Sequence, residues 1–146
     1  MSDTIVVVED NPDDEALVRM ALRRNRIENP VVCVRDGVEA VALLAGPRAD
    51  APALVLLDLK MPKLDGLDVL RAIRAPSSPS RLAPVVVLTS SIEPGDLRRA
   101  YGAGANSYLR KPVDFEDFVR LVGLVAAYWL ERNEPPPDPQ REEALP

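Results

Sequence analysis

The feature that most constrains this chain is a strict alternation between short apolar segments and longer segments with helical periodicity. The apolar segments are rich in valine, isoleucine and leucine, as in strands that are buried on both faces. They occupy residues 5–8, 30–34, 54–57 and 85–88, and a half-polar segment at 107–110 fits an edge strand. Strands that alternate with helices are joined by right-handed crossovers. The sequence therefore predicts an α/β fold: a doubly wound, five-stranded parallel sheet with helices on both faces.

The start of the first helix is indicated by local signals. Asn11 offers an N-cap and Pro12 suits the first helical position, and three acidic residues follow at the positive end of the helix dipole. The apolar residues expected to face the sheet are Ala16, Leu17, Met20, Ala21 and Leu22.

Composition excludes several classes of protein. With 146 residues, 47% of them hydrophobic, the chain fits one globular domain. A formal net charge of -5 argues against a nucleic-acid partner. The single cysteine cannot form an internal disulfide, and no apolar stretch has the length of a signal sequence or membrane span, so we expect a cytoplasmic protein with no membrane partner. The domain should span residues 1–132, and the proline-rich segment 133–146 should stay extended or disordered.

Polar residues follow four of the predicted strands at their carboxyl ends, where open parallel sheets bind ligands. In chain order they are Glu9, Asp10, Asp58, Thr89, Ser90 and Lys111. Three crowded carboxylates repel one another, and oxygen ligands of this kind suit Mg2+, which also accepts phosphate oxygens. Lys111 would supply positive charge on the other side. We therefore expect a site that neutralises a phosphoryl group while one carboxylate remains free to attack it.

Each of the charged residues in this set also has a purely structural interpretation. Glu9 and Asp10 could cap the first helix, Asp58 could belong to a turn, and Lys111 could lie in an ordinary loop. Tyr108 could be a plain edge-strand aromatic. The functional interpretation is favoured because the charged residues fall where the fold predicts convergence.

Together these segments resemble the receiver domain of two-component response regulators, the CheY-like family. The matching segments are Val8-Glu9-Asp10-Asn11, Leu57-Asp58-Leu59-Lys60-Met61-Pro62 with Asp65-Gly66, Val87-Leu88-Thr89-Ser90, and Gly104-Ala105 through Tyr108 to Lys111-Pro112. Their order and spacing cover residues 5–132. The resemblance implies a flavodoxin-like (βα)5 sheet with strand order 2-1-3-4-5.

The resemblance also implies a reaction. Asp58 would accept a phosphoryl group from a phosphohistidine on a partner histidine kinase, forming an aspartyl phosphate. Asp10, Asp58 and the backbone carbonyl of Lys60 would hold Mg2+, with Glu9 acting directly or through water. The protein would then be a phosphoacceptor in signal transduction and not an enzyme with an external substrate.

Further positions are assigned to the response that follows phosphorylation. Thr89 and Lys111 would contact phosphoryl oxygens, and Tyr108 matches the aromatic switch position, whose ring turns inward as the threonine moves. Lys60 departs from the small polar residue that is frequent at its position in the family. We expect the lifetime of the phosphorylated state to be tuned by residues that flank the site: Lys60, Ser90 and Ser91.

The last predicted helix is unusually apolar around its circumference. It should run from an Asp114 cap to about Arg132, with little polar face to meet solvent. We expect a second protomer, rather than the proline-rich tail, to cover the apolar surface of this helix. The dimer would form through Leu121, Val125, Tyr128 and Trp129. This helix and the start of the chain resemble single-domain regulators paired with phytochrome-type histidine kinases, which implies a bacteriophytochrome as the kinase.

Three classes of function remain open from the sequence. The leading one is a phosphorylatable switch, acting alone or as an intermediate receiver in a phosphorelay. A hydrolase with an aspartyl nucleophile would typically need a second acid two residues after Asp58, where the chain has Lys60. An interaction module that is never phosphorylated is disfavoured by the intact acidic set. The chain has no histidine, so the phosphoryl group must come from another protein or a small donor.

Overall fold

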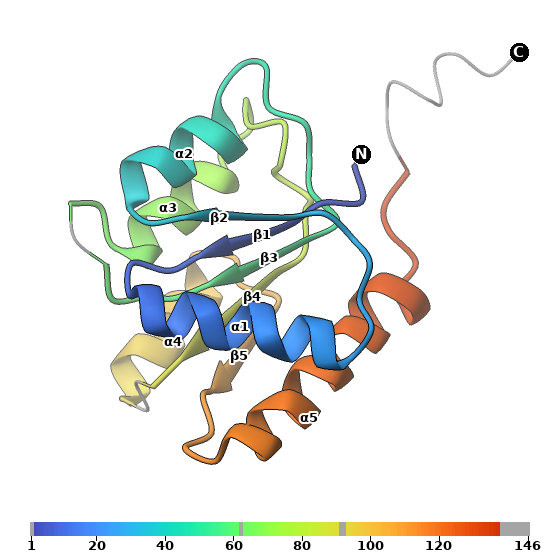
Figure 1. The fold of residues 1–146 in the computed structure, drawn as a ribbon. Coiled ribbons are helices and arrows are strands. Elements are labelled where there is room, and N and C mark those ends of the chain that lie inside the picture. Colours follow the sequence, from blue (N-terminus) through green and yellow to red (C-terminus); the bar gives the residue numbers. More distant parts are fainter. Residues whose placement is uncertain (1, 62, 91–92, 138–146) are drawn as a thin grey trace, which may run out of the picture.

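The computed structural model describes residues 2–61, 63–90 and 93–137, and Figure 1 shows the fold. Its first half contains β1 (Ile5–Val8), α1 (Pro12–Arg24), β2 (Val31–Val34), α2 (Gly37–Ala45) and β3 (Leu54–Leu57). Its second half contains α3 (Gly66–Ile73), β4 (Val85–Thr89), α4 (Pro94–Gly102), β5 (Ser107–Arg110), α5 (Phe115–Ala126) and a π-helix, η1 (Ala127–Arg132).

All five strands pair in parallel in the order β2-β1-β3-β4-β5. This confirms the predicted doubly wound sheet and its strand order, and it places β5 at an edge. Strands β2 and β3 both pair with β1 along its whole length, from Ile5 to Val8. At its end, Val8 lies beside Val34 of β2 and Leu57 of β3. The residues that follow β1 and β3 therefore leave the sheet side by side.

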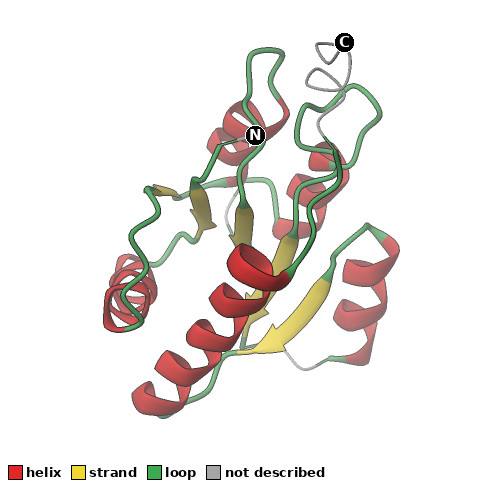
Figure 2. Ribbon diagram, turned by 90° about the vertical axis from the view of Figure 1, so that its right-hand side faces the viewer, coloured by secondary structure: helices red, strands yellow, loops and turns green. Residues whose placement is uncertain are grey.

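Two apolar layers enclose the sheet, and Figures 1 and 2 show helices on both of its sides. Successive strand residues point to opposite layers, so Val6 and Val8 contact one cluster while Ile5 and Val7 contact the other. The first cluster includes buried residues of α2, α3 and α4, and the second includes buried residues of α1 and α5. Burial on both faces explains why β1, β3 and β4 are apolar, apart from Thr89 at the end of β4.

The predicted start of α1 is confirmed, but its predicted buried face is partly wrong. The Asn11 side chain accepts hydrogen bonds from the backbone N–H groups of Asp13 and Asp14, at 2.8 and 3.2 Å. Val18, Ala21 and Leu22 are the buried residues, whereas Leu17 and Met20 are 40% and 44% exposed and Ala16 is also exposed. Because α1 has apolar side chains on several sides, its sequence permits more than one rotation against the sheet.

The last helix ends at Arg132 as predicted, but its final turns differ from a regular α-helix. The chain changes to π-helical geometry at Ala127, and the backbone N–H of Asn133 bonds to the carbonyl of Tyr128. Residues 133–137 form neither helix nor strand, and residues 138–146 of the expected tail lie outside the described residues. Within the described parts of the chain, no helix is long and apolar enough to cross a membrane.

Candidate functional site

Three carboxylates meet at the carboxyl ends of β1 and β3. The backbone N–H of Asp58 bonds to the carbonyl of Val8 at 3.0 Å, which holds the end of β3 against the end of β1. Glu9 is buried, and Asp10 and Asp58 are partly exposed. One oxygen from each lies within 4.8 Å of the others. The structure therefore brings together the acidic residues that the sequence singled out.

Lys111, the residue that follows β5, places its ammonium next to these carboxylates. Its backbone N–H bonds to the carbonyl of Thr89 at 2.8 Å, which extends the pairing of β4 and β5. Its Nζ lies 2.7 Å from Glu9 Oε2, 3.5 Å from Asp58 Oδ2 and 3.6 Å from Asp14 Oδ2. The lysine is thus a counter-charge shared by several carboxylates, including Asp14 from the first turn of α1.

Burial changes the proton affinity of Glu9. Removal from water raises its pKa to about 7, and the negative charge of Asp58 acts in the same direction. Hydrogen bonds from Lys111 and from the backbone N–H of Asn11 oppose this shift without cancelling it. For Lys111, burial lowers the pKa, but the hydrogen bond to Glu9 and the nearby carboxylates outweigh it and raise the pKa overall.

The donor set fits a hard divalent cation. Mg2+ and similar ions prefer oxygen ligands and take one or two carboxylates together with water and phosphate oxygens. The backbone N–H of Lys60 bonds to Asp58 Oδ1 at 3.2 Å, so the Lys60 peptide lies directly against the Asp58 carboxylate. Net negative charge on Glu9, Asp10 and Asp58 would also be relieved by a cation. The acidic cluster is therefore compatible with a divalent metal site.

The predicted switch residues lie on the two strands at this edge of the sheet. Thr89 ends β4 and is 1% exposed, and the next residue, Ser90, is exposed. Tyr108 lies on β5 opposite Val87 and packs, partly buried, against the cluster that contains α3 and α4. Ser91 lies outside the described residues.

Two residues missed by the sequence analysis, Asp96 and Arg99, form an ion-pair chain with Lys60. Its Nζ lies 3.5 Å from Asp96 Oδ2, and Arg99 donates to Asp96 Oδ1 at 2.7 Å. Asp96 has a buried side chain, although it lies in the first turn of α4, where an acidic residue is expected to face solvent. Sequence alone gives no signal for the contact between Lys60 and Asp96, because it joins the loop after β3 to α4, and these segments are distant along the chain. All three residues line a cleft of about 570 Å3 that also includes Asp10.

Gly66 is another residue to which the sequence analysis gave no functional role. Its N–H bonds to the carbonyl of Leu59 at 2.9 Å, which ties the start of α3 to the loop after β3. A Cβ atom at this position would lie 2.5 Å from the Asp58 carbonyl oxygen and 2.6 Å from the Leu59 Cα. Only glycine lets α3 begin this close to the backbone of Asp58 and Leu59.

We expect Gly66→Ala to lower the free energy of unfolding by about 2 kcal/mol, because backbone atoms next to Asp58 must move to admit the methyl group. Urea unfolding measures the change. Gly102→Ala is the matched control, since a Cβ there meets nothing within 4 Å. Equal effects of the two substitutions would contradict the proposed clash.

The residues predicted to form a dimer lie away from the acidic cluster, at the carboxyl end of the chain. Leu121, Val125 and Trp129 are partly buried against the cluster formed by α1, α5 and the sheet. Tyr128 is 52% exposed, and Leu124, which was not in the predicted set, is 70% exposed. The exposed apolar face is therefore narrower than predicted and centres on Leu124 and Tyr128.

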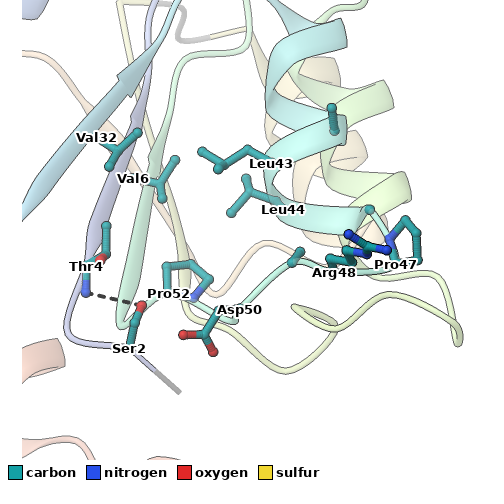
Figure 3. Close-up of a pocket in the computed structure, with 13 residues that line it drawn as sticks. Ser2, Thr4, Val6, Val32, Leu43, Leu44, Pro47, Arg48, Asp50 and Pro52 are labelled. Carbon is teal, nitrogen blue, oxygen red and sulfur yellow. Dashed lines mark hydrogen bonds between the residues drawn. The ribbon is translucent and has the colours of Figure 1, made fainter.

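A separate pocket lies at the opposite end of the sheet. Figure 3 shows Ser2 and Thr4 before β1, Pro52 before β3 and the residues after α2 around this hollow of about 510 Å3. Val6, Val32, Leu43 and Leu44 give it a mainly apolar wall. It lies at the amino ends of the strands, so it is not continuous with the carboxylates that follow their carboxyl ends.

Comparisons with known proteins agree with this architecture. Residues 5–123 match the response regulator receiver domain. The chain belongs to this family and is a response-regulator receiver domain, which confirms the resemblance found in its motifs.

The probable methanogenesis regulatory protein FilR2 of Methanothrix harundinacea is 43% identical over 135 residues, which cover 90% of this chain and 86% of that protein. The crystal structure of the phosphorylated cyanobacterial phytochrome response regulator RcpA is 35% identical, with a TM-score of 0.83 over 94% of this chain and all (100%) of that chain. The Mn2+-bound form of Rcp1, a response regulator of Synechocystis, is 34% identical, with a TM-score of 0.81 over 92% of this chain and 99% of that chain.

Proposed function

We propose that this protein is a single-domain response regulator of a two-component system, in which Asp58 accepts a phosphoryl group from a histidine kinase. The observation that carries this proposal is that the partly exposed Asp58 carboxylate lies 3.5 Å from the Lys111 ammonium and in one cluster with Glu9 and Asp10. An Asp58 oxygen would attack phosphorus while the bond to the donor imidazole nitrogen breaks, and that nitrogen would be left to take up a proton. Transfer of this kind depends mainly on positioning and on neutralising charge.

The metal in this proposal is Mg2+, held by Asp10, Asp58 and the backbone carbonyl of Lys60, with Glu9 acting directly or through water. When bound, such an ion neutralises charge on the phosphoryl oxygens. Lys111, whose partly buried ammonium lies beside these acids, would offer a second positive charge. Support for a divalent metal also comes from the Mn2+-bound structure of Rcp1.

We propose that Thr89 and Tyr108 convert phosphorylation into a change of surface. Thr89 would donate its hydroxyl to a phosphoryl oxygen, and the Tyr108 ring would turn further inward. Their positions on neighbouring strands, the burial of Thr89 and the partial burial of Tyr108 support this proposal. Residues Lys60, Ser90 and Ser91 would tune how long the phosphoryl group remains.

The chain would act as a phosphoacceptor whose only chemistry is its own phosphorylation and dephosphorylation. A role as an intermediate receiver in a phosphorelay uses the same site and differs only in the next acceptor. A hydrolase for external phosphate esters is less well supported, because the second acid that such enzymes use is replaced by Lys60, whose ammonium lies on Asp96.

A bacterial phytochrome is the kinase that we propose, since the relatives include the phytochrome response regulator RcpA. Both proteins would meet in the cytoplasm, with no role for nucleic acid or a membrane. In this proposal residues 1–132 form the receiver unit, and the segment 133–146 lies outside it.

The direct test is labelling with a radioactive small phosphodonor such as acetyl phosphate, with Mg2+ or with EDTA. We expect one acyl phosphate per chain, which alkali and hydroxylamine cleave, and no label in EDTA. A candidate phytochrome kinase labelled beforehand should transfer its phosphate to this protein within the mixing time. Sustained release of phosphate from an ester substrate would instead favour the hydrolase.

We further propose that the protein forms a homodimer through its last helices. Leu124 and Tyr128 offer an exposed apolar face, and the Tyr128 and Trp129 rings pack edge to face with centroids 4.8 Å apart. A two-fold axis would let the same patch cover itself.

We expect Leu124→Glu to weaken dimerisation at least about tenfold, because it places a charge at the centre of the proposed contact. Sedimentation velocity over a range of protein concentrations measures the change. Leu82→Glu is a matched control, since Leu82 is also exposed, at 53%, but lies between α3 and β4. A wild-type protein that stays monomeric, or a dimer that both substitutions weaken equally, would refute this interface.

A further inference from the structure

The side chain of Lys60 is held by a helix that is not part of the acidic cluster. Its backbone lies against Asp58, but its ammonium lies 3.5 Å from Asp96 Oδ2 on α4. The lysine side chain is 67% exposed, whereas the Asp96 side chain is only 6% exposed. A mobile cation on a solvent-exposed stem is thus bound to a fixed, buried anion.

Asp96 does not depend on Lys60 alone for its counter-charge. Arg99, one helical turn later, donates to the other carboxylate oxygen at 2.7 Å. A buried carboxylate without a partner would be costly, but here Arg99 stays in place when Lys60 leaves. Lys60 is therefore exchangeable, and its release leaves no unpaired buried charge.

Phosphorylation of Asp58 would create a competitor for this ammonium. A phosphoryl group brings up to two negative charges and three acceptor oxygens to the residue whose carboxylate already accepts the Lys60 N–H. The Lys60 stem lines the cleft of about 570 Å3 beside Asp10, through which solvent reaches this side of the cluster. A lysine chain laid over the phosphoryl group would cover it and exclude attacking water.

We propose that Asp96 is a positioning residue that keeps the Lys60 ammonium off the phosphoryl group and thereby shortens the lifetime of the aspartyl phosphate. This inference rests on the proposed phosphorylation of Asp58. It assigns a role to the buried acid of α4 and couples the position of that helix to the rate of water attack. In the attack, the oxygen of water forms a bond to phosphorus, the bond to the Asp58 oxygen breaks, and the water proton passes to solvent.

The test measures loss of label after acetyl phosphate is removed, in the presence of Mg2+. We expect Asp96→Asn to slow this loss about threefold and Lys60→Met to accelerate it about twofold, in line with the modest strength of exposed ion pairs. The double variant should lose label at the rate of Lys60→Met alone, since without the Lys60 ammonium there is no cation for Asp96 to keep off the phosphoryl group. If Asp96→Asn has the same effect with and without Lys60, or if it accelerates the loss, the inference is wrong.

Two controls match the changes in charge. Lys63→Met removes a lysine of similar exposure from the same loop, and Asp68→Asn removes the partner of an arginine three residues later on α3. Both should leave the lifetime unchanged within about 1.5-fold, as expected for exposed pairs away from the site. A change as large as that of Asp96→Asn in either control would overturn the assignment to Asp96.

Arg99→Gln gives an independent test with the opposite sign. Loss of Arg99 removes one counter-charge from the buried Asp96 carboxylate, so the Lys60 ammonium is held more firmly and label should be lost about twofold faster. A slower loss would overturn the inference even if Asp96→Asn fails to fold. Failure of the wild-type protein to take up label would instead refute the proposed phosphorylation itself.

Discussion

Asp58→Asn should reduce phosphoryl labelling by at least about 100-fold, because an amide oxygen is a poor nucleophile and cannot replace the carboxylate that forms the acyl phosphate. Glu9, Asp10 and Asp58 lie close enough for label to move to a neighbour if position did not matter. We expect no such transfer, because Lys111 pairs with Glu9 at 2.7 Å and occupies its oxygen. Acid-quenched gels and intact-protein mass after treatment with acetyl phosphate and Mg2+ measure the loss.

The same substitution should not destabilise the metal-free protein. The charge of Asp58 raises the pKa of Glu9, so its removal relieves repulsion within the cluster. A variant that loses label and keeps or gains stability in urea therefore separates chemistry from unfolding. Asp65→Asn is the control, since Asp65 caps α3 by accepting from the Asp68 N–H and lies at the other end of the same loop. Full labelling of Asp58→Asn would place the acceptor elsewhere.

Stability of the metal-free protein should fall as pH rises from 4.5 to about 7.5, through the titration of Glu9. Its pKa is about 7 in the folded protein against an ordinary 4.5, mainly because of burial. Between these values the folded protein holds a proton that the unfolded chain has lost, so the stabilising contribution is complete below 4.5 and is lost as pH approaches 7. The size of the loss is about 3 kcal/mol, from the value of one pKa unit.

The measurement is the difference in urea unfolding free energy between wild type and Glu9→Gln, in EDTA, across this pH range. The difference isolates Glu9, because glutamine does not titrate. Asp36, whose pKa is lowered by the hydrogen bond from the Glu39 N–H, and Cys33, whose pKa burial raises to about 11, both titrate outside the window. Saturating Mg2+ should abolish the fall, since a cation favours the ionised carboxylate. A difference that grows with pH would show that Lys111 holds Glu9 ionised.

The order of the elements and most of the acidic site could be predicted from local sequence. Unbroken apolar strands such as Leu54–Leu57 need helices on both faces, and parallel strands deliver their carboxyl ends to one edge of the sheet. Asp10 and Asp58 meet for that reason alone. The Asn11 cap was also predictable, since it uses only residues within one turn of helix.

Contacts between distant segments were not predictable in the same way. Leu17 and Met20 were expected to face the sheet, but the structure exposes them and buries Val18 together with the predicted Leu22, because contact with the sheet selects one rotation of α1. The apolar surface of α5 was overestimated for a related reason: Leu121, Val125 and Trp129 find cover within the chain's own core. Hydrophobic pattern gives the presence of a buried face, while packing decides which residues form it.

The sequence by itself determined the doubly wound sheet and the meeting of Asp10, Asp58 and Lys111, because both follow from hydrophobic periodicity and from the direction of parallel strands. Only the tertiary structure decided that Glu9 is buried, with its pKa raised to about 7, and that the Lys60 ammonium pairs with Asp96. Burial and ion pairing depend on distances between segments far apart in the chain. Local sequence specifies conformation within a few residues, and those distances are fixed only when the helices pack on the sheet.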